Sequence, residues 1–296
     1  MAQVFSYDSN ARRESLLDII TNISPTENYL LSNLAKSKSS NTQHEWVTDT
    51  LKTPATNAQI EGSDASFANR TNPGRVTNWT QIVRVDFQVS DSERARNYPQ
   101  FADRYRYEMS KAMKEWSNDA EFNLVRSTQA TGLGSGTARS MVGLKSAIST
   151  VATTLSAVSL SENHLNAYLQ NAWSQGGKVD TVLVGATLKR RISGFTANGT
   201  KQFQQQEKEL VNVVDMYISD FGPVKVILHR YVTIAGTDAG QDIVGIQADK
   251  FRVAYFREPE HVALAKSGSS TKGMIEGELT LEYLAENSSF KAINHA

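Results

Sequence analysis

The longest periodic segment of the sequence is NYPQFADRYRYEMSKAMKEWSNDAEFNLVRSTQ, residues 97–129. Apolar residues recur in it every three or four positions, which predicts an α-helix with one buried face. This apolar stripe consists of Phe101, Tyr105, Met109, Met113 with Ala112, Trp116, Ala120 and Leu124. On the other faces, Arg104 precedes Glu108 and Lys111 precedes Glu115 by four residues, a spacing that favours ion pairs along a helix.

The length of this helix constrains the shape of the subunit. About 30 helical residues would form a rod of roughly 45 Å. A compact chain of 296 residues would have a diameter of only about 50 Å. We therefore expect a flat or elongated subunit built along this helix.

Two strand-like segments precede the helix, and a long polar connection separates them. Apolar and polar residues alternate in residues 45–51 and 78–89, whereas residues 52–77 are rich in Ala, Asn, Thr and Gly. A connection of this length is uncommon inside a compact domain, so we expect it to be functional or to find its partners in another chain. Trp46 and Trp79 would either pair across this hairpin and pack on the long helix, or bind a neighbour; both can hold.

The first and last parts of the chain mix helical and strand patterns, which predicts an α+β fold. Near the N-terminus, residues 16–23 and 29–34 predict two short helices, the second preceded by a capping box at residues 24–27. The middle of the chain predicts a helix capped by Ser161 with Leu165, Leu169, Ala172 and Trp173 on its apolar face, a strand at 179–184, a helix with Leu188, Ile192 and Phe195 on one side, and a hairpin of 211–219 with 224–233. The final strands are expected at 243–247, 251–257, 262–265 and 276–284.

The composition excludes several classes of protein. The chain has 31 Lys and Arg against 31 Asp and Glu, so it lacks the basic excess that is usual in dedicated nucleic-acid binders. It has no cysteine, which excludes disulfides and thiolate metal sites. The first twenty residues contain no apolar core of a signal peptide, and no stretch of 18 apolar residues occurs. We expect neither secretion nor a membrane span.

No pattern of catalytic or ligand-binding residues emerges. The five histidines have no zinc-binding spacing, and the glycine-rich residues 132–136 follow a helix rather than the strand that a phosphate-binding loop requires. The turn at Gly185 could offer a helix N-terminus to an anion, and Lys189, Arg190 and Arg191 follow it. A solvated helix face is the simpler interpretation of these cations. The sequence predicts no cofactor, no metal and no catalytic residue, which favours a structural or binding role.

Five stretches, in order, resemble the major capsid proteins of tailed bacteriophages, which have the Hong Kong 97-type (Johnson) fold. They are residues 20–51 (ITNISPTENYLLSNLAKSKSSNTQHEWVTDTL), 77–87 (TNWTQIVRVDF), 176–203 (GGKVDTVLVGATLKRRISGFTANGTKQF), 211–226 (VNVVDMYISDFGPVKV) and 263–268 (ALAKSG). The resemblance rests on their number and order, because no single motif among them is diagnostic.

The resemblance implies a role for each part of the chain. Residues 1–44 would form an N-terminal arm under a neighbouring subunit, and 45–90 an extended loop across the adjacent subunit. Residues 91–160 and 238–296 would form a peripheral domain with a spine helix at about 97–129, and 161–237 an axial domain around the fivefold and sixfold axes. No long helical scaffolding segment precedes the arm, which implies a separate scaffolding protein or a matured chain.

On this basis we predict three groups of residues at subunit contacts. The extended loop would contribute Trp46, Ile60, Glu61, Phe67, Arg70, Arg75 and Trp79. The spine helix would contribute Arg104, Glu108 and Lys111. The axial domain would contribute Arg190, Arg191, Phe195 and Asn198.

The implied function is self-assembly into pentamers and hexamers of an icosahedral or prolate head that encloses double-stranded DNA. The head would assemble in the host cytoplasm and remain in the virion, with portal, scaffolding and cement proteins as partners and with DNA bound without sequence specificity. One alternative keeps the fold and assigns it to an encapsulin-type nanocompartment. Another is an α/β enzyme that binds a phosphorylated ligand at residues 185–191. Local charge balance suits a self-assembling wall, since a uniformly charged subunit would repel its copies.

Overall fold

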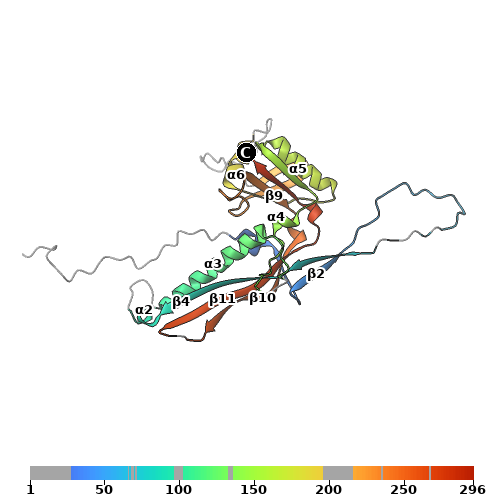
Figure 1. Ribbon diagram of the computed structural model, residues 1–296. Coiled ribbons are helices and arrows are strands. Elements are labelled where there is room, and N and C mark those ends of the chain that lie inside the picture. Colours follow the sequence, from blue (N-terminus) through green and yellow to red (C-terminus); the bar gives the residue numbers. More distant parts are fainter. Residues whose placement is uncertain are drawn as a thin grey trace, which may run out of the picture.

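A computed structural model of the chain describes residues 28–65, 67, 70, 72–96, 103–132, 136–195, 216–234, 236–266 and 268–296. Figure 1 shows a long lower body, an upper body, and a loop that extends away from both. The lower body contains a four-stranded sheet and one long helix, and the upper body contains a six-stranded sheet and two helices. The mixture of helices and sheets confirms the α+β class, and the long lower body confirms an elongated shape.

The long helix, α3 (Arg104–Arg126), is the spine helix of the lower body. It begins where the Asp103 side chain accepts the backbone N–H of Tyr105 at 2.9 Å, and Ser127 ends it in an extended conformation. With 23 residues, it is about 35 Å long, shorter than expected. The C-terminal end of the predicted helix was wrong, because α3 ends at Arg126 rather than at residue 129. Residues 97–102, the first part of the prediction, lie outside the described residues.

The spine helix buries most of its predicted stripe against the four-stranded sheet. Trp116 is 2% exposed, and its Nε1 donates to the carbonyl of Val83 at 2.8 Å. A Cβ on Gly277 would lie 2.7 Å from the Trp116 ring, so the glycine permits the close approach of helix and sheet. Met113 was predicted to be buried but is 38% exposed, because the buried positions run through Ala112 instead.

The sheet of the lower body has the strand order β1-β10-β11-β4. Its strands are β1 (Ala35–Lys38), β4 (Gln81–Ser90), β10 (Phe251–Leu264) and β11 (Ser270–Tyr283). Strands β10 and β11 form a long antiparallel hairpin, β4 pairs with β11, and β1 adds to β10 in parallel. The short helix α2 (Asp91–Ala95) follows β4 at the far end, and α4 (Leu144–Ala147) lies at the other end of the spine.

The upper body has the strand order β5-β12-β9-β6-β8-β7. Its strands are β5 (Ala152–Val158), β6 (Thr181–Val184), β7 (Met216–Ser219), β8 (Gly222–Leu228), β9 (Gln241–Ile246) and β12 (Phe290–His295). Helices α5 (Glu162–Ser174) and α6 (Ala186–Ser193) cover one face of this sheet. Two 3-10 turns, η2 (Ala248–Lys250) and η3 (Glu286–Ser288), precede β10 and β12.

Several local predictions for the upper body are confirmed. The Ser161 side chain caps α5, strand β6 turns through Gly185 into α6, and β7 pairs with β8 as a hairpin. Trp173 was placed on the buried face of α5, but it is 60% exposed. Phe195 lies just after α6 and packs, half-buried, on the core beneath the helix.

Three predicted boundaries require correction. The residues of β5, β9 and β12 were assigned to the peripheral domain, but these strands pair within the upper sheet, and β5 and β12 were not predicted as strands. Alternation shows that a strand has one buried face, but not which sheet it joins. The segment 78–89 is two strands rather than one, because Thr80 separates β3 (Gly74–Trp79) from β4. Strand β4 therefore belongs to the subunit's own sheet. The extended loop, predicted at residues 45–90, consists of β2 (Gln43–Thr48), β3 and the residues between them.

The N-terminal residues that the structure describes belong to the subunit's own core. Leu30 and Leu34 of the region around α1 (Tyr29–Asn33) are buried beside the spine. Glu121 of the spine is fully buried and accepts the backbone N–H groups of Leu30 at 2.7 Å and Leu31 at 3.0 Å. Helix α1 is thus attached to the spine, and any arm reaching a neighbour must lie before it. The predicted first helix and the capping box lie outside the described residues.

Candidate functional site

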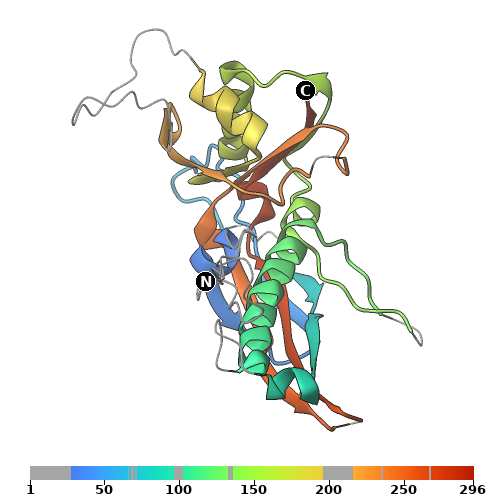
Figure 2. The same ribbon diagram turned by 90° about the vertical axis from the view of Figure 1, so that its left-hand side faces the viewer.

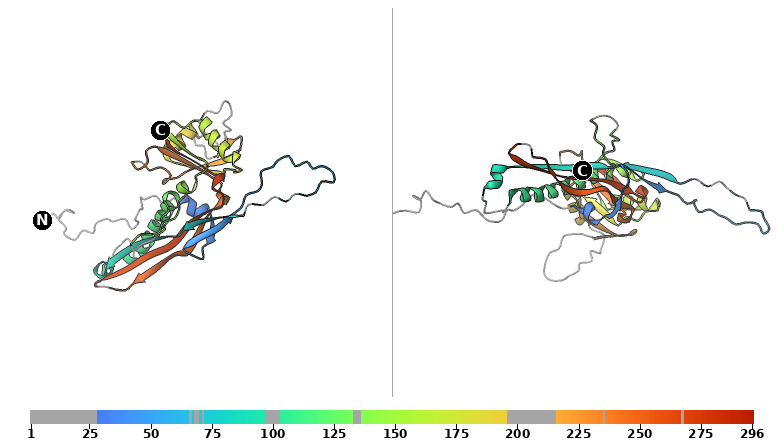
Figure 3. Two further views of the ribbon diagram at one scale, coloured as in Figure 1. Left: turned by 45° about the vertical axis from the view of Figure 1, so that its right-hand side comes forward. Right: turned by 90° about the horizontal axis from the view of Figure 1, so that it is seen from below.

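The loop between β2 and β3, residues 49–73, carries three large apolar side chains that are largely exposed within the described part of the chain. Leu51 is 97% exposed, Ile60 82% and Phe67 95%. Figures 1 and 3 show the loop extending well beyond the rest of the molecule. The described residues of the loop form hydrogen bonds with near neighbours, such as Ser63 N–H to the carbonyl of Ile60 at 3.0 Å and Gln59 Nε2 to Asn57 Oδ1 at 3.0 Å. A loop built in this way gains its apolar burial only from another molecule.

The two tryptophans of the hairpin do not pair with each other. In the β2–β3 register, Trp46 lies opposite Val76 and Trp79 lies opposite Gln43. Trp46 is only 8% exposed, and its ring packs edge-on against Tyr283 with ring centres 5.0 Å apart. Trp46 is therefore held inside its own subunit and is removed from the predicted contact surface. Trp79 is half-buried.

Three charged residues were predicted at the contacts of the extended loop; two of them lie between β2 and β3, and the third lies on β3 itself. Glu61 and Arg70 lie exposed on the loop itself. Arg75 belongs to β3 and forms an ion pair across the hairpin with Glu45, with Nη1 3.2 Å from Oε2. Exposed pairs of this kind contribute little to stability. Arg75 already has a partner in its own hairpin, whereas Glu61 and Arg70 extend with the loop.

The predicted contact residues of the spine form ion pairs along the helix. Arg104 Nη2 lies 2.7 Å from Glu108 Oε1, and Lys111 Nζ lies 3.6 Å from Glu115 Oε1. Both predicted pairings are confirmed. The loop, the spine and α6 lie in different parts of the molecule (Figure 1), so the three predicted groups do not form one continuous site within a subunit.

The upper-body residues occupy the second half of α6 and the residues after it. Arg190 is exposed and Arg191 half-buried, both in the last turn of α6, and Asn198 lies outside the described residues.

At the N-terminus of α6, a Cβ on Gly185 would lie 3.2 Å from Thr233. Lys189 Nζ donates to the carbonyl of Val226 at 2.5 Å. The cations therefore lie away from the helix N-terminus that would bind an anion, which argues against the phosphate-ligand enzyme.

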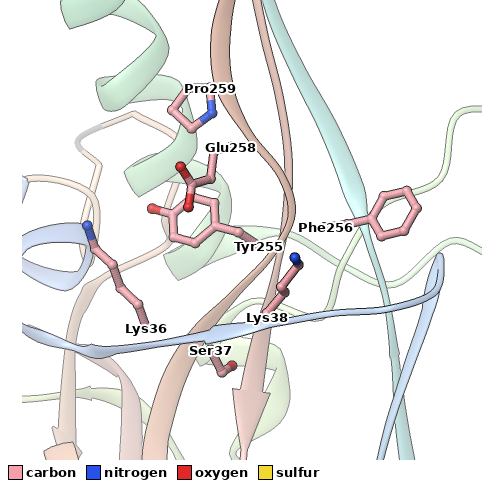
Figure 4. A pocket seen from close by; sticks show the side chains of 7 residues that line it. All are labelled: Lys36, Ser37, Lys38, Tyr255, Phe256, Glu258 and Pro259. Carbon is pink, nitrogen blue, oxygen red and sulfur yellow. The ribbon is translucent and has the colours of Figure 1, made fainter.

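An open groove of about 620 Å³ flanks the edge of the lower sheet. Figure 4 shows Lys36 and Lys38 of β1 pointing to the side where Tyr255 and Glu258 lie, while Ser37 points the opposite way. The Lys36 ammonium lies 5.9 Å from the centre of the Tyr255 ring, and burial raises the pKa of that phenol.

Within the described ranges, no group of His, Asp or Glu residues could hold a metal ion, and no helix is long and apolar enough to cross a membrane.

A model of the SU10 major capsid protein family matches residues 2–295, nearly the whole chain. The chain belongs to the SU10 major capsid protein family. The capsid protein is 23% identical to the major capsid protein of Escherichia phage Phieco32, over 94% of this chain and 93% of that one.

Solved structures also share the fold of the capsid protein. The capsid of a native GTA particle superimposes with a TM-score of 0.69 at 8% identity, over 98% of each chain. The holo-SrpI encapsulin complex from Synechococcus elongatus PCC 7942 gives a TM-score of 0.60 at 11% identity, over 100% of this chain and 96% of that one. The capsid protein has the Hong Kong 97-type fold. It forms a homo-oligomeric shell and is a component of the virion.

The sequence did not reveal a set of buried polar side chains at the base of the extended loop. Asn78 and Thr80 are fully buried, and Glu278 of β11 is 2% exposed. Arg139, which follows the spine, reaches Glu278 with Nη2 2.7 Å from Oε1. Polar residues in alternating strands are expected to face solvent, so no local signal indicates that these side chains are buried. The alternation of residues 78–89 continues through Thr80 in the sequence, and the break at Thr80 is seen only in the structure.

Proposed function

We propose that the capsid protein closes its shell by docking the extended loop of each subunit on a neighbour. The observation that carries this proposal is the exposure of Leu51, Ile60 and Phe67 on one projecting loop. Soluble proteins that expose apolar residues together usually bury them in an interface. A second copy of the chain is the partner, because a shell supplies that surface at every position.

The contact energy arises from many repeats of a modest interaction. Complete burial of one Leu, Ile or Phe side chain is worth about 1.5–3 kcal/mol. Part of this gain offsets the cost of ordering the loop backbone, about 1–2 kcal/mol for each residue fixed. One docked loop would therefore bind weakly, whereas a closed shell engages many loops at once. Assembly can then proceed reversibly until the shell closes.

The other regions take the roles that the Hong Kong 97-type fold suggests. The upper body would pack around the fivefold and sixfold axes of pentamers and hexamers, with Arg190 and Arg191 near those contacts. The residues before α1 would reach a neighbouring subunit. The closed icosahedral or prolate head would enclose double-stranded DNA without reading its sequence, together with portal, scaffolding and cement proteins. The role is structural, and we propose no catalytic step.

Substitution of the three apolar loop residues tests the proposal. The variant Leu51→Ser, Ile60→Ser, Phe67→Ser should fold as the wild type does but should form no closed shells in negative-stain micrographs. The matched control is Thr53→Ala, Thr56→Ala, Ser63→Ala, which changes three polar residues of the same loop and should assemble normally. Closed shells from the serine variant at wild-type yield would refute the role of the loop.

An encapsulin complex shares the fold at a TM-score of 0.60, but the match to a major capsid protein family over residues 2–295 favours the phage head over the encapsulin-type nanocompartment. The contents of the particles separate the two functions. Purified particles from the natural source should contain nuclease-protected double-stranded DNA if they are phage heads. Particles that hold a protein cargo and no protected DNA would favour the nanocompartment.

A further inference from the structure

Two segments project from the lower body, and their bases meet. The first is the extended loop, carried by β2 and β3. The second is the segment between α3 and α4, residues 127–143, which Figure 2 shows in light green leaving the body beside the spine. Its two sides are joined by reciprocal backbone hydrogen bonds between Ala130 and Ser140, at 3.1 and 3.0 Å.

Asn78 joins these two bases and is fully buried. Its Oδ1 accepts the backbone N–H of Val142 at 2.8 Å. Its Nδ2 donates to the carbonyl of Leu281 at 2.7 Å and to the carbonyl of Val142 at 3.2 Å. The side-chain carbonyl and both amide hydrogens are thus engaged. One side chain connects the returning strand of the extended loop, the base of the second projection and strand β11.

Glu278 of β11 joins the same two bases through Thr80, which lies two residues after Asn78. Thr80 Oγ1 donates to Glu278 Oε1 at 2.5 Å, and Arg139 Nη2 donates to the same oxygen at 2.7 Å. Arg257 Nε donates to the other carboxylate oxygen at 3.3 Å. The backbone N–H of Thr80 also donates to the carbonyl of Thr42, at the start of the hairpin, at 2.9 Å. The buried carboxylate is therefore compensated by two guanidinium groups and a hydroxyl.

We propose that Asn78, Thr80, Arg139 and Glu278 form a positioning hub that fixes the direction of the extended loop relative to the spine and to the second projection. The hub residues are buried or partly buried within one subunit, so they act on assembly through the loops they hold. Arg139 Nε has no hydrogen-bond partner among the described residues, but the Glu278 carboxylate and the Asn78 amide are paired, and a displacement of the loop would leave them unpaired. This inference rests on the proposed docking function: if each loop binds a neighbour, its departure angle sets the angle between subunits and hence the curvature of the shell.

The test compares shell geometry with subunit folding. The double variant Thr80→Val, Arg139→Gln removes two donors to Glu278 while keeping the shape of the threonine side chain. The variant Asn78→Ala removes the second connection. The matched control is Thr77→Val with Arg84→Gln. Thr77 lies in β3 beside Asn78, and its side chain forms no hydrogen bond with the described residues; Arg84 forms an exposed pair with Asp86. Thermal unfolding of unassembled subunits and the distribution of particle diameters by electron cryomicroscopy are measured for each.

The hub predicts that the variant subunits fold but assemble into open sheets or into shells of more than one diameter, while the control keeps the single wild-type diameter. A change that only weakened the fold would lower the yield and leave the diameter unchanged. Shells of the single wild-type diameter from the double variant would therefore overturn the hub, whatever their yield. If Asn78→Ala does not fold, the double variant decides alone. If instead the loop variant Leu51→Ser, Ile60→Ser, Phe67→Ser closes shells at wild-type yield, the proposed docking function fails.

Discussion

Trp116 on the spine helix and Phe67 on the extended loop are both large aromatic side chains, yet they face opposite environments. Trp116 is 2% exposed and bonded to the carbonyl of Val83, whereas Phe67 is 95% exposed. The spine packs on β4 and β11 of its own subunit, whereas Leu51, Ile60 and Phe67 of the loop are each at least 82% exposed. The comparison separates the residues that hold the subunit together from those available to hold subunits to one another.

The largest expected effect comes from exchanging these two aromatic residues for alanine. Trp116→Ala should lower the free energy of unfolding of the unassembled subunit by about 3–5 kcal/mol, because it leaves a cavity over Gly277 and an unpaired carbonyl on Val83. Phe67→Ala should change it by less than about 0.5 kcal/mol, because the ring makes no contact with its own core. Urea denaturation followed by tryptophan fluorescence and circular dichroism would measure both. Similar losses of unfolding free energy in the two variants would contradict the assignment of Trp116 to the subunit core and of Phe67 to intersubunit contacts.

Polar groups also hold the subunit together, through an ion-pair network at the end of the spine. At the end of the spine, the Arg126 guanidinium donates to both carboxylate oxygens of Asp238, at 2.8 and 2.6 Å. Lys145, which also pairs with Asp242, lies 3.6 Å from Asp238. The hydrogen bond from Arg126 is the main reason that the pKa of Asp238 falls from 3.8 to about 2. This network attaches the spine to the segment between β8 and β9.

The second-largest expected effect on the free energy of unfolding comes from removing the Asp238 carboxylate, whose pKa is lowered in the folded chain. The carboxylate stabilises the fold above the pKa of the unfolded chain, and this contribution is lost as the pH falls from about 4 to about 2. Asp238→Asn should therefore cost about 2 kcal/mol at neutral pH and should flatten the decline in stability below pH 4. The control Asp86→Asn removes an exposed carboxylate paired with Arg84 at 3.1 Å and should leave the decline unchanged. Equal acid profiles for wild type and Asp238→Asn would contradict the role of this pair.

The difference between spine and loop also explains what the sequence could predict. The spine was predictable because its buried positions follow the helical period, which is a local property. The loop was recognisable because its residues lack any buried period. The strand alternation of β9 did not indicate its sheet, because pairing partners are set by distant residues, and β12 was not predicted as a strand. Asn78, Glu121 and Glu278 were missed for a related reason: each is polar, and only the folded chain brings their partners to them.

The smallest effect on folding should come from Lys111, and it tests whether the spine also serves assembly. Lys111 and Glu115 are about half exposed and 3.6 Å apart, so Lys111→Gln should change the free energy of unfolding by less than about 0.5 kcal/mol. If Lys111 contacts a neighbouring subunit as predicted, the protein concentration needed for assembly should rise while the unfolding temperature stays the same. Lys114→Gln, an exposed lysine on the same helix outside the predicted contact, is the control. Equal assembly of the two variants, measured by light scattering, would assign Lys111 to the solvated face of the spine and remove it from the predicted contact residues.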